Sequence, residues 1–132
     1  MRIIGTLIIA AAMAMPSVAF AQDVRQETVR FAPGTSGTTI RDSIKGDHSV
    51  RYSLRVRAGQ KMSVQLDTSN ASNYFNITAP NANEALFIGS TEGNGASLAV
   101  PASGDYVIDV YLMRNAARRG ETAKYELTIH VE

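Results

Sequence analysis

The stretch HSVRYSLRVRAGQKMSVQLD, residues 48–67, decides the fold class because apolar and polar side chains alternate along it twice. Apolar residues occupy every second position on both sides of the segment AGQK, residues 58–61. They are Val50, Tyr52, Leu54 and Val56, followed by Met62, Val64 and Leu66. A period of two turns one face of each segment toward a core, as in half-buried antiparallel strands. We therefore predict a β-hairpin here, with Gly59 in the turn.

Two further stretches repeat the alternation, DYVIDVYLM at residues 105–113 and KYELTIHVE at residues 124–132. Shorter apolar segments occur around Val29, Ile40, Ile77, Ile88 and Leu98. Clusters of Gly, Pro, Asn, Asp and Ser separate these segments and favour chain reversal. No segment longer than a turn or two has a helical period. Short strands with turns about every 8 to 12 residues are typical of a β-sandwich. We predict an all-β, antiparallel, jelly-roll-like sandwich of about eight or nine strands.

The N-terminus has the pattern of a secretory signal peptide. Arg2 precedes an apolar run, residues 3–15, and the small-residue pattern Ala19-Phe20-Ala21 follows. The run falls short of the roughly 20 residues that span a bilayer, so a membrane anchor is the weaker interpretation. We expect a signal peptide at residues 1–21, cleavage after Ala21, and one mature domain at residues 22–132. This predicts a periplasmic or secreted protein without a membrane anchor.

Composition argues against several classes of function. Removal of Arg2 with the signal peptide leaves 12 Lys+Arg against 12 Asp+Glu, a formal net charge of zero. Nucleic-acid binding depends largely on neutralising phosphates, so a nucleic-acid partner is not expected. The chain has no cysteine, which excludes disulfides, thiolate metal sites and thiol nucleophiles.

The sequence shows no convergent catalytic or metal-binding group. Asp47, His48 and Ser49 are contiguous, and adjacent side chains of an extended segment face opposite ways, so they cannot converge as a catalytic triad. His130 lies on the outward face of the last expected strand, and two isolated histidines do not form a zinc site. We expect a protein that is not an enzyme and that has no metal and no cofactor.

The segment at residues 113–123 is the exception to the short turns. If the strands on either side of it were neighbours, it would be an eleven-residue projection, longer than the usual hairpin loop of about 2 to 5 residues. Its sequence RNAARR favours a helical turn that displays Arg114 and Arg118 on one side. The alternative is that its arginines only keep the loop soluble, or brace it by pairing with Glu121 and with backbone carbonyls.

Several motifs together resemble a known family. They are IKG at residues 44–46, AGQK at 58–61, PASGDY at 101–106, RNAAR at 114–118 and KYELTI at 124–129. In this order they resemble the periplasmic inhibitors of goose-type lysozyme over nearly all of the mature chain. AGQ, PASGDY and the closing Y-x-L strand also resemble the bacterial pre-peptidase C-terminal domain, a β-sandwich accessory module. The RN-x-AR pattern favours the inhibitors. Similar chains also carry the label "DNA breaking-rejoining protein", for which these residues offer no chemistry.

The resemblance implies a protein partner, a lysozyme or related muramidase, whose acidic cleft is blocked by an inserted loop. The inserted residues would be Arg114 and Arg118, with Asn115 shaping the loop and Arg119 beside them. A neighbouring loop contributes a tyrosine after KG in the inhibitor family, whereas this chain has Asp47 and His48 there. The negative charge of Asp47 should oppose an acidic cleft unless it orients an arginine.

A second hypothesis is a non-catalytic binding module for the cell envelope, for peptidoglycan or a protein, of the pre-peptidase type. Tyr111 and the basic strand face of Arg51, Arg55 and Arg57 would then matter more than the loop. The simpler interpretation of that face is a solvated sheet surface.

Overall fold

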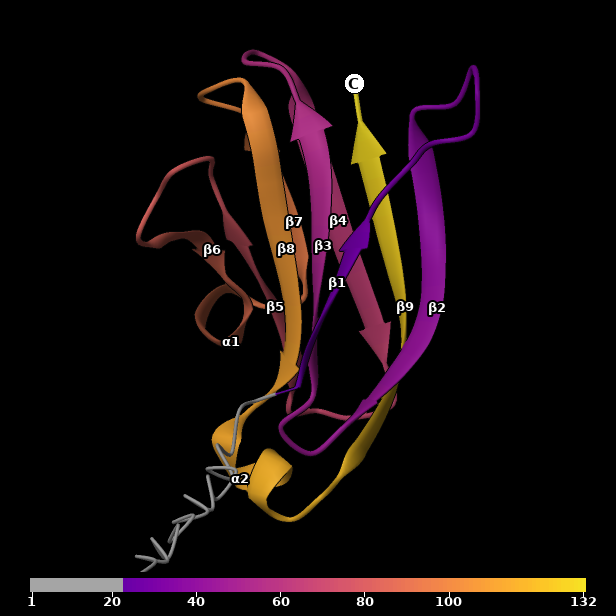
Figure 1. Cartoon of the computed structure of the whole chain (residues 1–132), viewed down its shortest axis with the longest axis vertical. Helices are drawn as coiled ribbons and strands as arrows, with labels where there is room; N and C mark the ends of the chain where they lie inside the picture. The colour runs from indigo at the N-terminus through magenta and orange to yellow at the C-terminus, as the bar shows by residue number, and fades with distance from the viewer. Residues whose placement is uncertain (1–22) are drawn as a thin grey trace, which may run out of the picture.

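The chain forms two β-sheets that pack face to face (Figure 1). The computed structural model describes residues 23–132, and the expected signal peptide at residues 1–21 lies outside the described residues. The first sheet has the order β1 (Val24–Thr28), β3 (Ser49–Val56), β8 (Gly104–Leu112), β5 (Asn73–Thr78) and β6 (Ala85–Ile88). The second has the order β2 (Gly37–Lys45), β9 (Thr122–Val131), β4 (Lys61–Thr68) and β7 (Gly95–Ala99). The described residues also include two short helices, α1 (Gly89–Glu92) and α2 (Arg114–Arg118). The prediction of an all-β sandwich is confirmed.

The core lies between the two sheets and consists of the side chains that the alternation assigned to it. Every second residue is buried along β3 and β9, and also over residues 62–66 of β4 and 106–112 of β8. The buried residues include all seven apolar residues of the opening stretch. The hydroxyl groups of Tyr52 on β3 and Tyr125 on β9 lie 2.7 Å apart inside this core and share a hydrogen bond. That contact joins the two sheets through their side chains.

The predicted hairpin at residues 48–67 is wrong. Its two strands exist, and Gly59 has the positive φ of 87° that a tight turn requires, but β3 and β4 belong to opposite sheets. β3 pairs with β8, and β4 pairs with β9 and β7. Alternation shows which face of a strand is buried, but it does not show which strands pair. Two strands that pack face to face across the core alternate in the same way as two strands that are hydrogen-bonded neighbours in one sheet. Residues 57–60 therefore form an arch between the sheets.

Consecutive strands lie in opposite sheets throughout the described residues, with the single exception of β5 and β6. β1 and β3 are thus separated by one strand of the other sheet. The chain reverses twice between them, and they pair in parallel, Val24 opposite Ser49. The other strand pairs are antiparallel, so the expectation of a purely antiparallel sandwich holds except at this edge.

β8 and β9 are also in opposite sheets, which corrects the assumption that they are neighbouring strands. β9 begins at Thr122, earlier than the sequence indicated, because residues 122–124 extend the ladder with β2. Residues 113–121, here named the arginine loop, therefore span the end of the sandwich from one sheet to the other. Residues 57–60 cross the same distance of about 10 Å between the sheets with four residues, so the arginine loop is longer than the crossing requires.

Candidate functional site

The arginine loop begins with a single helical turn, α2, as predicted. The Met113 amide donates to the Ser72 carbonyl over 2.9 Å, which ties the start of the turn to the segment before β5. The Ala117 amide donates to the Met113 carbonyl over 2.9 Å and closes the turn. Gly120 follows with a φ of 67°, the left-handed conformation that commonly ends a helix. The loop is thus fixed by backbone hydrogen bonds at both of its ends.

The faces of α2 are clearly divided. Ala116 is fully buried and closes the end of the core, whereas Arg114, Asn115 and Arg118 are exposed. Arg114 and Arg118 are four residues apart and therefore lie on one side of the turn, opposite Ala116. Within residues 23–132, neither guanidinium has a hydrogen bond or an ion pair to another side chain. Both groups are therefore available to a partner.

Arg119 differs from the other two arginines of the loop. Its Nε donates to Glu121 Oε2 over 2.6 Å, and the same carboxylate accepts a hydrogen bond of 3.0 Å from Asn70 Nδ2. The hydrogen bonds from Asn70 and Arg119 hold the pKa of Glu121 below its usual range. The interpretation that arginines brace the loop thus applies to Arg119, which contacts Glu121, but not to Arg114 or Arg118.

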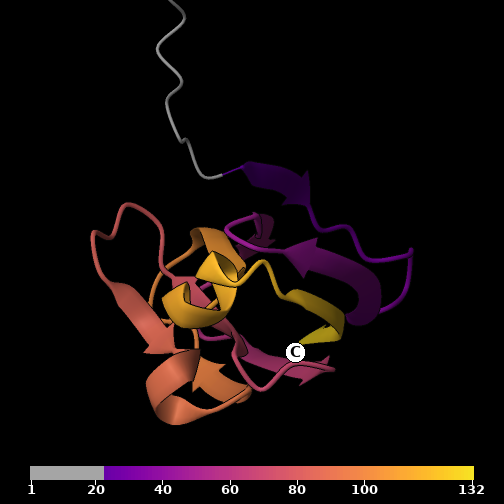
Figure 2. The same ribbon diagram turned by 90° about the horizontal axis from the view of Figure 1, so that it is seen from below.

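The turn between β2 and β3 lies beside the arginine loop, at the same end of the sandwich (Figure 2). The Gly46 amide donates to the Glu121 carbonyl over 2.9 Å. Gly46 has a φ of 63°, and a Cβ added there would lie 3.6 Å from the Ala117 carbonyl oxygen. The structure therefore brings the two loops singled out in the sequence into direct contact, with the exposed Asp47 and His48 at the tip of the second loop.

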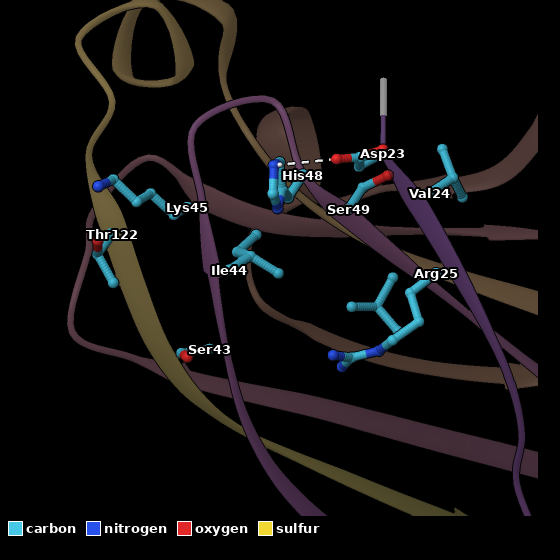
Figure 3. Close-up of a pocket in the computed structure, with 10 residues that line it drawn as sticks. Asp23, Val24, Arg25, Ser43, Ile44, Lys45, His48, Ser49 and Thr122 are labelled. Atoms are coloured by element: carbon cyan, nitrogen blue, oxygen red, sulfur yellow. Dashed lines mark ion pairs between the residues drawn. The ribbon is translucent and has the colours of Figure 1, made fainter. Parts of the chain in front are cut away.

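Asp47 and His48 have different surroundings. Asp47 makes no hydrogen bond or ion pair through its side chain among the described residues, so no arginine is oriented by it. His48 Nε2 lies 3.4 Å from Asp23 Oδ2 at the start of β1 (Figure 3). The pair stands at the edge of a cavity of about 560 Å³ between β1 and β2, in which Arg25 is already paired with Asp42. The His48 side chain is thus directed toward β1.

A groove of about 650 Å³ extends from the two loops onto the outer face of the first sheet. Its rim contains the four loop residues Asp47, His48, Arg114 and Arg118. Its floor contains four residues from β3, β5 and β8, which are Arg51, Asn76, Asp109 and Tyr111. The groove is therefore charged at its rim and largely polar along its floor.

The floor residues contact one another across the strands. The Tyr111 hydroxyl donates to Asn76 Oδ1 over 3.0 Å, and the Gly89 amide donates to the same oxygen over 3.3 Å. Asp109 Oδ2 lies 3.7 Å from Arg51 Nε, while Asp109 Oδ1 is shielded from solvent without a hydrogen-bond partner in the described structure. Burial raises the pKa of the Asp109 carboxyl, and the charge of Arg51 offsets part of that rise.

Asn76 and Asp109 were not identified from the sequence. They are 33 positions apart in the chain, and only the pairing of β5 with β8 places them directly opposite each other. The available signal was weak: each is a polar residue at an outward position between two buried apolar residues.

Other candidates from the sequence do not converge. His130 Nε2 lies 2.9 Å from Glu132 Oε1, a carboxylate just beyond the end of β9. Within residues 23–132, no three His, Asp or Glu side chains are grouped so that they could hold a metal ion. In the same part of the chain, no helix has the length and apolar character needed to cross a bilayer.

Comparisons with known proteins give one consistent result. No protein-family model matches the chain. A curated relative, the inhibitor of g-type lysozyme of Escherichia coli K12, is 28% identical over 108 residues, which are 79% of each chain. The crystal structure of the Aeromonas hydrophila periplasmic inhibitor of g-type lysozyme aligns with a TM-score of 0.76 and 33% identity, over 83% of this chain and 98% of that chain.

The second resemblance is limited to the fold. The pre-peptidase C-terminal domain of a Bacillus anthracis collagenase aligns with a TM-score of 0.56 and 17% identity, over 84% of this chain and 96% of that chain. Both resemblances seen in the motifs are thus confirmed, and the first is the stronger at the level of sequence.

Proposed function

Because this chain belongs to the family of periplasmic inhibitors of g-type lysozyme, we propose that it binds a g-type lysozyme and blocks its acidic active-site cleft with the arginine loop. The observation that carries this proposal is the exposure of Arg114 and Arg118, whose guanidinium groups have no side-chain partner in the part of the chain that the structure describes. Arg119 lies beside them, braced by Glu121. Asn115 contributes its backbone carbonyl to the end of the turn.

The chemistry of the two arginines suits such a cleft. Glycoside hydrolases use a pair of carboxyl groups, one of them a general acid, so the cleft offers acidic acceptors. A guanidinium makes paired, charge-assisted hydrogen bonds with a carboxylate, and these strengthen when water is excluded. Residues of this kind at the centre of an interface commonly dominate the binding energy. The backbone hydrogen bonds of the arginine loop reduce the entropy lost on binding.

Asp47 gives the neighbouring loop of this chain a negative charge, so we propose that its recognition of the lysozyme differs from recognition by an inhibitor whose neighbouring loop is uncharged at this position. It is exposed, it has no cationic partner among the described residues, and it stands in the turn that contacts the arginine loop through Gly46. Its negative charge opposes that of the cleft. In our proposal it weakens or redirects the interaction without preventing it.

We also propose a periplasmic or secreted location with cleavage after Ala21. The basic, apolar and small-residue pattern of residues 2–21 supports this location, and so do relatives that are described as periplasmic. Because the relatives are inhibitors, the proposed function requires no catalytic group.

The test is the rate at which a g-type lysozyme clears a suspension of bacterial cell walls, with and without the mature protein. We expect the wild type to slow lysis and the double variant Arg114→Ala, Arg118→Ala to raise the inhibition constant by about 100-fold or more, as loss of two interface hot spots predicts. Arg119→Ala is the matched control and should change the constant by less than about threefold, since exposed ion pairs contribute little. Inhibition by the double variant equal to that of the wild type would contradict the role of the loop. A wild type that does not slow lysis would contradict the function itself.

A further inference from the structure

On the floor of the groove, a hydrogen-bond donor that has no partner among the described residues lies beside a hydrogen-bond acceptor. Asn76 on β5 and Asp109 on β8 are directly opposed in the ladder, so the pairing of the strands fixes their separation. Asn76 Oδ1 already accepts hydrogen bonds from the Tyr111 hydroxyl and the Gly89 amide, whereas its Nδ2 has no partner among the described residues. An amide donor and a carboxylate acceptor are thus presented side by side toward the groove.

The Asp109 carboxylate has fewer hydrogen bonds among the described residues than a partly buried carboxylate normally has. Its Oδ1 is shielded and has no hydrogen-bond partner within residues 23–132, and its Oδ2 lies 3.7 Å from Arg51 Nε, longer than a normal hydrogen bond. A shielded polar atom without a partner destabilises a fold, and in a native protein it calls for an explanation. Rotation about the last torsion of the side chain exchanges the two carboxylate oxygens, so either of them can be the one that faces a ligand in the groove. About 31% of the side chain remains exposed there.

Aromatic rings lie next to this donor and acceptor. Tyr111 is directly opposite Tyr74 on the outward face of the same two strands, and both are partly exposed. The bond from the Tyr111 hydroxyl to Asn76 Oδ1 fixes the orientation of its ring. A fixed, partly exposed ring offers an apolar contact beside the polar groups.

The charges around the floor decide which ligand fits. Arg51 lies 3.7 Å from Asp109 and would repel a cation that approached the carboxylate. The Asp109 carboxylate itself would repel an anion that approached the floor. A neutral ligand with many hydroxyl groups avoids both penalties, because each hydroxyl both donates and accepts hydrogen bonds.

We propose that Arg51, Asn76, Asp109 and Tyr111 form a binding site for a neutral, hydroxyl-rich oligosaccharide. Asp109 accepts from one or two sugar hydroxyls, Asn76 Nδ2 and the Arg51 guanidinium donate to ring or hydroxyl oxygens, and the Tyr111 ring contacts an apolar face of the sugar. The proposal does not depend on inhibition of lysozyme, since none of the four residues belongs to the arginine loop.

The test is calorimetric titration of the mature protein with chitotetraose and, separately, with cellotetraose. The first carries acetamido groups and the second does not, so the two arms show whether hydroxyls alone suffice. We expect the wild type to bind at least one of them and Asp109→Asn to bind it about tenfold or more weakly, as loss of a charge-assisted hydrogen bond predicts. Asp105→Asn is the matched control: it lies on the same face of β8, four residues away, and does not line the groove. It should bind as the wild type does.

Two results would overturn the proposal: no binding of either sugar by the wild type, or equal binding by Asp109→Asn and the wild type. Circular dichroism establishes that each variant is folded, and Asn76→Ala replaces Asp109→Asn if the latter is not. The sugar titration contains no lysozyme, and the lysis assay contains no added tetrasaccharide. Failure of either proposal can therefore be recognised without the other.

Discussion

The backbone amide of Gly46 donates to the backbone carbonyl of Glu121 over 2.9 Å, which fastens the β2–β3 turn to the arginine loop. Gly46 adopts a φ of 63° at this contact, a left-handed conformation that an L side chain disfavours by roughly 1–2 kcal/mol. Gly46→Ala should therefore lower the free energy of unfolding by about that amount and also weaken inhibition, because the two loops lose their relative position.

Gly59→Ala provides the control for Gly46→Ala. Gly59 has a φ of 87° and lies at the opposite end of β3, away from both loops. This variant should lose a similar amount of stability in urea denaturation and keep full inhibition. Equal loss of inhibition in both variants would show that general destabilisation, and not loop position, is responsible.

Asp47→Asn should strengthen inhibition. Asp47 is exposed and unpaired among the described residues, so removing its charge leaves no cationic group of the described structure without a counter-charge. Loss of one negative charge near an acidic cleft is worth on the order of 1 kcal/mol, or about five- to tenfold in the inhibition constant at low salt. The gain should shrink at high salt because the charges are screened. Weaker inhibition by Asp47→Asn would mean that Asp47 contacts a donor on the lysozyme.

Glu121 should make the base of the arginine loop sensitive to acid. The hydrogen bonds from Asn70 and Arg119 lower the pKa of Glu121 in the folded protein. A lowered folded pKa means that the stabilisation is fully present above the pKa of the unfolded chain and disappears as the pH falls through the folded pKa. Glu121→Gln should therefore be less stable than the wild type at pH 7, with a difference that vanishes in acid. A constant difference at all pH values would contradict this assignment.

Asp109→Asn should stabilise the folded protein at neutral pH. Burial raises the pKa of Asp109 in the folded state, so the ionised form destabilises the fold above that pKa and the penalty disappears as the pH falls. The midpoint of thermal unfolding should therefore be higher for Asp109→Asn than for the wild type at pH 7, and the two should converge in acid. A lower midpoint at pH 7 would mean that Arg51 compensates the carboxylate fully.

The Tyr52 and Tyr125 hydroxyls should be coupled energetically. Each is the hydrogen-bond partner of the other at 2.7 Å in the core. Replacing either one with Phe leaves a buried hydroxyl unpaired, which costs about 1–3 kcal/mol. Replacing both removes the unpaired group, so the double variant should lose less than the sum of the single losses. Additive losses in a denaturation cycle would argue against the contact.

The sequence was sufficient to predict the layers of the fold but not the pairing of its strands. The alternation in β3, β4, β8 and β9 identified the buried faces because burial acts on each strand separately. It could not show that β3 and β4 lie in opposite sheets, since pairing depends on which strands meet across the whole chain.

The same limit applies to the candidate site. Arg114 and Arg118 could be identified because they share one turn, and local spacing determines their direction. The contact of Gly46 with the arginine loop agrees with the expected neighbouring loops, which the family resemblance implied. Asn76 and Asp109 could not be found, because their proximity arises only from the register between β5 and β8.

Nearly every connection in the described structure passes from one sheet to the other. This arrangement has an evolutionary consequence. The strands are held by their own ladders and core, so the arches at each end can change in length and sequence while the sandwich persists. A lineage with this architecture can acquire a new target by altering two adjacent arches. Grafting residues 113–121 and the β2–β3 turn together onto a related sandwich would be the shortest way to transfer recognition between them.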